Sequence, residues 1–189
     1  MKVCFKTLAG VVAFGLLAFA QSQPDQSKNP SGGAAAHDMK TANRMSGGDQ
    51  TFAMKAAQGG LAEVQFGNLA KEKASSPDVK SFGEMMVADH SKANDELKEI
   101  ASTKGITLPT SMDAKSQAMY DRMSKLSGAA FDKAYMKDMV ADHKMDVNEF
   151  KKQSERGTDA ELKAFAAKTL PTLQKHLQTA EETNSKLGK

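Results

Sequence analysis

Four polar side chains interrupt helical stripes that are otherwise apolar: Glu63, His90, His143 and His176. A helix that packs in a bundle turns its apolar face inward, so a polar residue on that face is the informative exception. Imidazole and carboxylate groups are common metal ligands, and three imidazoles with one carboxylate in a dry interior suit a transition metal. Buried histidines that serve only as hydrogen-bonding or pH-sensitive core residues are the competing interpretation.

The spacing of these residues from the nearest helix breaks predicts that they form one layer. Glu63 precedes a break near position 76, and His90 follows that break at almost the same separation. His143 precedes a second break near position 158, and His176 follows it at a slightly larger separation. The mismatch is about 1.5 Å along the helix axis for the first pair and about 4.5 Å for the second, so all four side chains are expected near mid-bundle.

The pentapeptide MVADH occurs twice, at 86–90 and 139–143. Each copy places a methionine, Met86 or Met139, four residues before a histidine and on the same helix face. Methionine fills hydrophobic cores more often than it binds metal. The repeat therefore also fits two helices that pack in equivalent surroundings.

Three aspartates lie close to these histidines in sequence. Asp89 and Asp142 each precede a histidine directly, so their side chains point about 100° away from it. That direction suits support of a histidine on a neighbouring helix better than binding of the same ion. Asp146 follows His143 by three residues and shares its face, which makes Asp146 the best additional carboxylate ligand.

Helices must position this layer, because alanine, lysine and methionine dominate the chain and runs of β-branched residues are few. Four long helices and one shorter helix are expected, at about 49–74, 77–104, 111–126, 128–156 and 159–187. Capping residues support these bounds: Asp49 before the first helix, Ser76 and Pro77 at the second, and glycines after the second and fourth helices, Gly105 and Gly157.

The long connection between the second and third long helices predicts the topology. A helix of about 28 residues is about 42 Å long. The connection offers about 24 Å of helix and about 23 Å of extended chain, enough to return along the bundle. We therefore expect an all-α fold, a four-helix bundle of ferritin-like layout with a long crossover that contains a short extra helix. A weak repeat, VKSF at 79–82 and LKAF at 162–165, suggests two equivalent hairpins.

The segment 1–48 predicts export followed by a spacer. Residues 1–20 carry Lys2 and Lys6, then an apolar run that ends in Ala-Phe-Ala, which is typical of a cleavable signal peptide; an uncleaved anchor is the alternative. Residues 21–48 are rich in Gln, Ser, Gly and Pro and predict a disordered spacer. The bundle domain then covers 49–187. Cleavage would remove Cys4, the single cysteine, and would place the chain in the periplasm or cell envelope.

Charge and motifs exclude several function classes. The formal net charge is +3, or +1 without Lys2 and Lys6, and no basic stripe with interleaved aromatic residues exists, so a nucleic-acid partner is not expected. The mature chain has no stable membrane span. No CxxC, HExxH or nucleophile-elbow pattern occurs, so nothing identifies an enzyme. A protein partner and the oligomeric state stay open.

These residues together resemble a family. The segment from Phe52 to Glu63, both MVADH copies, Phe131-Asp132 with Tyr135, and Leu170-Pro171 before His176 are similar to the bacterial domain-of-unknown-function family 4142. The resemblance covers about 49–187 and implies an exported, ferritin-like helical bundle of unknown function. Ferritin-like di-iron proteins use Glu-x-x-His on two helices. The residues three before the histidines here are not acidic (Val87, Val140 and Leu173), so di-iron chemistry is not expected.

The leading hypothesis is a periplasmic metal-binding bundle. The predicted ligands are His90, His143 and His176 with Glu63 or Asp146. Histidine-rich ligation favours copper or zinc before iron. The alternative is a non-catalytic envelope bundle that acts through a partner, and a weaker third option is an oxidoreductase. Histidines that face one another would favour the metal, and histidines each capped by protein hydrogen bonds would favour the partner.

Overall fold

The computed structural model describes residues 46–188, and these form five helices and no strand. The helices are α1 (Gly47–Lys73), α2 (Pro77–Lys104), α3 (Ala114–Met123), α4 (Gly128–Arg156) and α5 (Ala160–Leu187). The all-α class and the short extra helix are confirmed. The predicted signal peptide, 1–20, and most of the predicted spacer, 21–48, lie outside the described residues.

The first helix begins earlier than the sequence suggested. Ser46, not Asp49, is the N-cap of α1, and its hydroxyl oxygen accepts a hydrogen bond from the Asp49 amide at 3.1 Å. The expectation that Asp49 caps this helix is therefore wrong. Its carboxylate is used elsewhere in the fold, as described below.

The second helix begins and ends as predicted. Pro77 occupies its first turn, where a missing amide hydrogen costs nothing and the fixed φ favours the helix. Gly105 ends it with a φ of 65°, a left-handed conformation that residues with a Cβ rarely adopt. Local chemistry at these two residues sets the bounds of α2.

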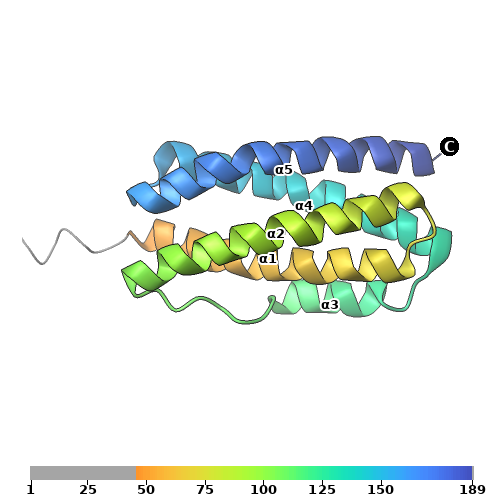
Figure 1. Ribbon diagram of the computed structural model, residues 1–189, viewed down its shortest axis with the longest axis horizontal. Helices are drawn as coiled ribbons and strands as arrows, with labels where there is room; N and C mark the ends of the chain where they lie inside the picture. The colour runs from red at the N-terminus through yellow and green to blue at the C-terminus, as the bar shows by residue number, and fades with distance from the viewer. Residues whose placement is uncertain (1–45, 189) are drawn as a thin grey trace, which may run out of the picture. The chain divides into compact units, whose positions relative to one another are not determined.

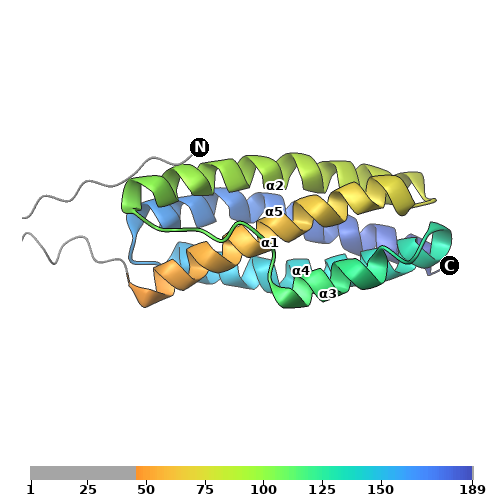
Figure 2. The same cartoon turned by 90° about the horizontal axis from the view of Figure 1, so that it is seen from below.

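The long helices pack as two hairpins joined by a long connection. α1 packs mainly on α2 and α4 mainly on α5, while α2 also lies against α5 and α1 against α4. Figures 1 and 2 show that packed neighbours among these four run antiparallel and that α2 and α4 run in the same direction. They can do so because residues 105–127 return along the bundle, with α3 against α1 and α4.

Two glycines let α1 and α2 approach closely. A Cβ added at Gly67 would lie 2.6 Å from the carbonyl oxygen of Gly83, and one at Gly83 would lie 2.7 Å from that of Gly67. Neither position can carry a side chain without moving the helices apart. The first hairpin is therefore held tightly one to two turns from Glu63 and His90.

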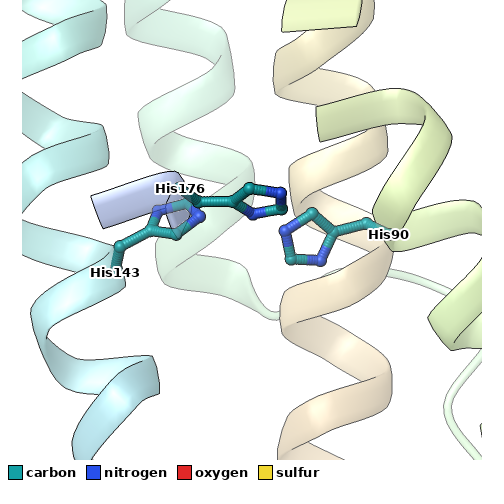
Figure 3. Close-up of side chains that lie close together, drawn as sticks. All are labelled: His90, His143 and His176. Carbon is teal, nitrogen blue, oxygen red and sulfur yellow. The ribbon is translucent and has the colours of Figure 1, made fainter. Parts of the chain in front are cut away.

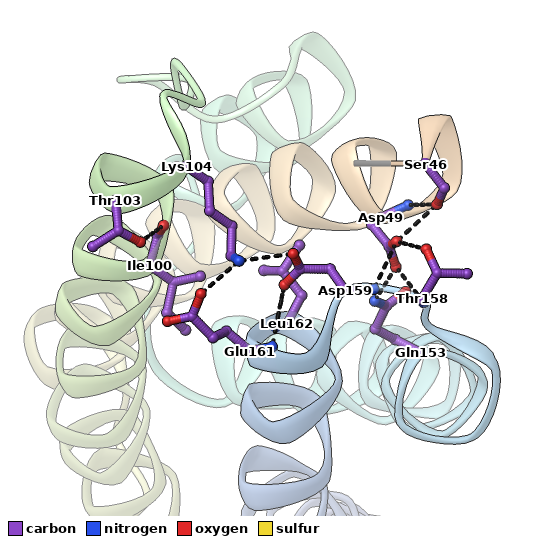
Figure 4. Close-up of polar contacts among 10 residues, drawn as sticks. All are labelled: Ser46, Asp49, Ile100, Thr103, Lys104, Gln153, Thr158, Asp159, Glu161 and Leu162. Carbon is purple, nitrogen blue, oxygen red and sulfur yellow. Dashed lines mark hydrogen bonds and ion pairs between the residues drawn. The ribbon is translucent and has the colours of Figure 1, made fainter. Parts of the chain in front are cut away.

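Asp49 ties the start of α1 to the turn between α4 and α5 (Figure 4). Its carboxylate is 1% exposed and accepts hydrogen bonds from the amides of Thr158 and Asp159 at 3.2 and 3.1 Å. The Gln153 amide group donates at 2.6 Å, and the hydroxyls of Thr158 and Ser46 donate as well. Burial raises the pKa of Asp49, but the hydrogen bonds from Thr158, Gln153 and Ser46 outweigh it and lower the pKa to about 2.

Asp132 makes the equivalent connection from the start of α4 to the turn between α1 and α2. It is also 1% exposed, and it accepts hydrogen bonds from the amides of Ser75 and Ser76 at 3.1 and 2.9 Å and from the Ser75 hydroxyl. Asp49 and Asp132 have the same separation in sequence as the VKSF and LKAF copies of the weak repeat. We call these two contacts the turn locks, because each aspartate holds the turn of the other hairpin.

Lys104 adds an ion-pair contact beside the Asp49 lock. Its amino group lies 2.7 Å from a carboxylate oxygen of Asp159 and also pairs with Glu161 (Figure 4). Lys104 is the last residue of α2, and Asp159 is the N-cap of α5. The pair therefore fixes the end of one helix to the start of another, with each charge placed favourably for its helix dipole.

The core consists of two hydrophobic clusters with a polar layer between them. One cluster contains Phe66, Met86 and Met139, and the other contains Phe52, Leu97 and Leu173. On α2, α4 and α5 the residues between the two clusters include His90, His143 and His176. Within residues 46–188, no helix is both long and apolar enough to cross a membrane.

Candidate metal centre

Three histidines from three helices meet in the middle of the bundle (Figure 3). His90 comes from α2, His143 from α4 and His176 from α5. Their ring centroids are 5.4 to 6.0 Å apart, and one ring nitrogen from each lies within 4.8 Å of the other two. The predicted convergence of the three imidazoles is therefore present.

Each of these rings holds a nitrogen that has no hydrogen-bond partner. The atoms are Nε2 of His90, Nε2 of His143 and Nδ1 of His176, and all three are buried. Buried polar atoms in proteins are nearly always hydrogen-bonded, so three unpaired nitrogens at one place require an explanation. A bound group that accepts three nitrogen lone pairs would provide one.

The backbone of α4 fixes the tautomer of His143. Its Nδ1 lies 3.0 Å from the carbonyl oxygen of Met139. A carbonyl oxygen can only accept, so Nδ1 carries the proton and donates it. The lone pair of the neutral ring is therefore on Nε2, the unpartnered atom.

The Asp89 carboxylate fixes the tautomer of His176. Nε2 of His176 donates to the Asp89 carboxylate, from α2, over 2.8 Å. The prediction that Asp89 supports a histidine on a neighbouring helix is confirmed. The hydrogen bond leaves the lone pair of His176 on Nδ1, and a carboxylate–histidine pair of this kind orients metal-binding imidazoles.

Burial keeps the three imidazoles neutral. It lowers the pKa of His90 well below its usual value, and the positive charges that His143 and His176 would carry lower it further. The pKa of His143 falls to about 4, through burial and then through His176. Burial also lowers the pKa of His176, although Asp89 opposes the change. Neutral imidazole is the form that binds a metal ion.

Glu63 reaches the polar layer from α1 but meets only one of the three histidines. A carboxylate oxygen of Glu63, one of Asp142 and a ring nitrogen of His143 lie within 4.8 Å of one another. Glu63 is 1% exposed, and neither of its oxygens has a hydrogen-bond partner. Burial raises its pKa well above the usual value, and the charge of Asp142 raises it further.

Asp142 is the carboxylate that sequence reasoning set aside as a ligand. Along the axis of α4, Asp142 is about 1.5 Å from His143 and therefore lies at nearly the same height, whereas Asp146 is about 4.5 Å from His143. The structure places Asp146 outside both groups of ligand atoms among the described residues. Burial raises the pKa of Asp146 to about 8, with the charges of Asp142 and Glu149 adding to the effect.

Asp146 and His90 instead share a cavity of about 90 Å³. Gly59 and Gly60 of α1 also line it, together with Asn94 of α2. A Cβ at Gly59 would meet nothing within 4 Å, so the absence of a side chain there leaves space beside His90.

Tyr135 also has a buried, unpartnered polar atom, its hydroxyl oxygen. Burial raises the pKa of Tyr135 well above its usual value, and the charge of Glu63 raises it further. A lone tyrosine among core positions carries no periodicity signal, and the sequence pointed to it only through the family motif.

The two MVADH methionines, Met86 and Met139, are fully buried in the hydrophobic core.

Comparison with solved structures shows a shared helical fold. A DUF305 fragment from Deinococcus radiodurans superposes with a TM-score of 0.67 at 12% identity, covering 75% of this chain and 98% of that one. A DUF305 protein of Streptomyces coelicolor that is thought to be secreted gives 0.65 at 13%, covering 75% and 92%. CopM in its Cu(II)-bound form gives 0.63 at 15%, covering 73% and 96%.

The sequence comparisons identify the family. A search of curated proteins finds no match. The family model described as a domain of unknown function, DUF4142, matches residues 34–183, which is well over half of the chain and includes every histidine of the polar layer. The chain therefore belongs to the DUF4142 family.

Proposed function

We propose that this protein is a metal-binding helical bundle of the cell envelope. His90, His143 and His176 hold a copper or zinc ion through one nitrogen each. The protein stores, buffers or passes on this metal, or protects the envelope from it, and carries out no defined turnover. The observation that carries the proposal is the convergence of three buried imidazole rings, each of which holds a nitrogen without a hydrogen-bond partner.

The three residues fit such an ion in distance and in chemistry. Zinc–imidazole bonds are about 2.0–2.1 Å long, so two nitrogens on one ion lie at most about 4.2 Å apart. The nitrogens here lie within 4.8 Å of one another, so small ring rotations close the site. The hydrogen bonds from His143 to Met139 and from His176 to Asp89 leave the lone pair of each ring on its other nitrogen, where it can bind an ion.

The donor set favours copper or zinc. Imidazole nitrogen suits both metals, and three histidines with a fourth position left open is an arrangement that both accept. A di-iron centre would require more carboxylates, with acidic residues three before the histidines, and the chain has none there.

The surroundings support the rest of the proposal. Two antiparallel hairpins joined by a crossover, with α2 and α4 in the same direction, support a ferritin-like layout for residues 49–187. A neighbour with bound copper and a neighbour that is thought to be secreted share only the fold with this chain, and both agree with a metal-handling role outside the cytoplasm. His143 and His176 each make one protein hydrogen bond, but the histidines face one another and every ring keeps an unpartnered nitrogen, which favours metal binding over the partner-only alternative.

Equilibrium dialysis against Zn²⁺ and Cu²⁺ tests the proposal. The chain should be studied in a His37→Ala background, since His37 is the one other histidine in the sequence. One ion per chain is expected, and His143→Ala should abolish binding while circular dichroism shows unchanged helix content. Asp89→Asn should weaken binding about 10- to 100-fold, because it removes the orienting hydrogen bond to His176.

A matched control is Asp95→Asn, an exposed change on the same helix, which should leave the affinity unchanged. If His143→Ala binds zinc and copper as tightly as the parent protein, the histidine layer is not the metal site.

A further inference from the structure

Glu63 is a buried acid that faces the Asp142 carboxyl, which helps to raise its pKa, and its position raises a question that the three-histidine site does not answer. Both of its oxygens are unpaired, yet it is 1% exposed. It does not join the group formed by His90 and His176. A carboxyl group in this state costs stability unless something else binds it.

Asp142 connects Glu63 with the surface. It is only partly buried, and it lies in the wall of a pocket of about 250 Å³ between α1, α3 and α4. Three further aspartates line the same pocket: Asp113, Asp138 and Asp146. Lys55 and Lys115 also line it. Asp138 is paired with Arg122, and the raised pKa of Asp146 keeps it largely neutral at pH 7, so the remaining acidic and basic charges nearly balance. The pocket is therefore an open route from solvent to Asp142, lined by carboxyl groups.

His143 links this second group to the three histidines. Its Nδ1 donates to Met139, so the ring has one free lone pair, on Nε2. One lone pair binds one ion. A cation between Glu63, Asp142 and His143 and a cation between the three histidines therefore compete for the same atom.

We propose that Glu63, Asp142 and His143 form a second cation position, which a divalent ion enters through the pocket between α1, α3 and α4. Two carboxylates with one imidazole suit an oxygen-preferring ion such as Mn²⁺ or Fe²⁺ better than the histidine position does. The two positions are alternatives, with His143 as the shared ligand. This inference rests on the proposed function only in that shared residue.

Manganese is the probe that separates the two positions. Free Mn²⁺ gives a six-line electron paramagnetic resonance signal, and binding broadens it. The full chain in the His37→Ala background should bind one Mn²⁺. Glu63→Gln and Asp142→Asn, which preserve shape, should each weaken Mn²⁺ binding by at least about 10-fold. Asp95→Asn is the exposed control and should change nothing.

A double variant, His90→Ala with His176→Ala, distinguishes this inference from the proposed function. It should keep Mn²⁺ and should bind Zn²⁺ more weakly than the parent protein does, through the remaining position at Glu63, Asp142 and His143. One equivalent of Zn²⁺ added to the parent protein should release bound Mn²⁺.

The inference is overturned if the parent protein binds no Mn²⁺, or if Glu63→Gln and Asp142→Asn bind it unchanged. It is also overturned if the double variant loses Mn²⁺ or if Mn²⁺ and Zn²⁺ bind together. A Zn²⁺ affinity that is the same in the double variant as in the parent protein would instead contradict the proposed function and leave the Mn²⁺ results to be judged separately.

Discussion

The turn locks and the polar layer bury similar groups in opposite ways. Asp49 and Asp132 are carboxylates at the two ends of the bundle, and each accepts at least three hydrogen bonds from the turn that it holds. Glu63, in the middle, is equally buried and accepts none. His90 and His143 likewise each hold an unpaired nitrogen.

This difference separates structural polar groups from ligand-binding ones. A buried polar group that is fully hydrogen-bonded stabilises the fold. An unpaired one destabilises the fold, because it has lost its hydrogen bonds to water and has gained none from the protein. The locks need nothing beyond the chain. Under the proposed function, a bound metal ion completes the layer, and this asymmetry can be measured.

The largest effect is expected at a turn lock. Asp132→Ala removes the acceptor for the amides of Ser75 and Ser76, and we expect the free energy of unfolding to fall by about 2–3 kcal/mol. Urea unfolding measures this loss. Asp95→Ala, an exposed change, should stay within about 0.5 kcal/mol of the parent protein. A loss at Asp132 no larger than at Asp95 would show that the lock does not hold the turn.

The other lock should give the protein an acid-sensitive stability. The pKa of Asp49 is about 2 in the folded chain, below its value of 3.8 in model compounds. Its carboxylate therefore stabilises the fold fully above pH 3.8, and this contribution is lost as the pH falls from 3.8 to about 2. The contribution is about 2 kcal/mol at neutral pH.

Asp49→Asn measures that contribution. The variant should be less stable than the parent protein at pH 7, and the gap in urea midpoint should close as the pH approaches 2. A gap that stays constant between pH 7 and pH 2 would mean that the charge of Asp49 contributes nothing.

Removal of the buried acid from the polar layer should change the free energy of unfolding in the opposite direction and by a smaller amount. In metal-free protein, Glu63→Leu replaces a buried acid by an apolar side chain. We expect the free energy of unfolding to rise by about 1–2 kcal/mol. Thermal or urea unfolding in the presence of a chelator measures the change. Glu84→Leu, on the exposed face of α2, is the control and should have little effect. Strong destabilisation by Glu63→Leu would show that Glu63 serves the fold.

Local signals predicted most of the helix bounds. Pro77 and Gly105 act through their own backbone preferences, so the limits of α2 could be read directly. The start of α1 could not. Choosing between Ser46 and Asp49 as its cap depends on a distant turn, at Thr158, that binds the Asp49 carboxylate, and a local pattern holds no information about that turn.

For the site, counting residues from the helix breaks predicted height along the bundle but not rotation about each helix. The predicted heights were sufficient to show that His90, His143 and His176 would lie together. Rotation decides which carboxylate faces which ring, and it depends on how α1 packs against α4. Glu63 therefore meets Asp142, while Asp146, which the sequence favoured, lies outside both groups.

X-ray absorption at the zinc edge of the zinc-loaded chain, in the His37→Ala background, tests the central claim most directly. The account predicts three imidazole ligands with zinc–nitrogen distances of about 2.0–2.1 Å, and their loss in His143→Ala. A spectrum with only oxygen ligands, or one that His143→Ala leaves unchanged, would contradict it.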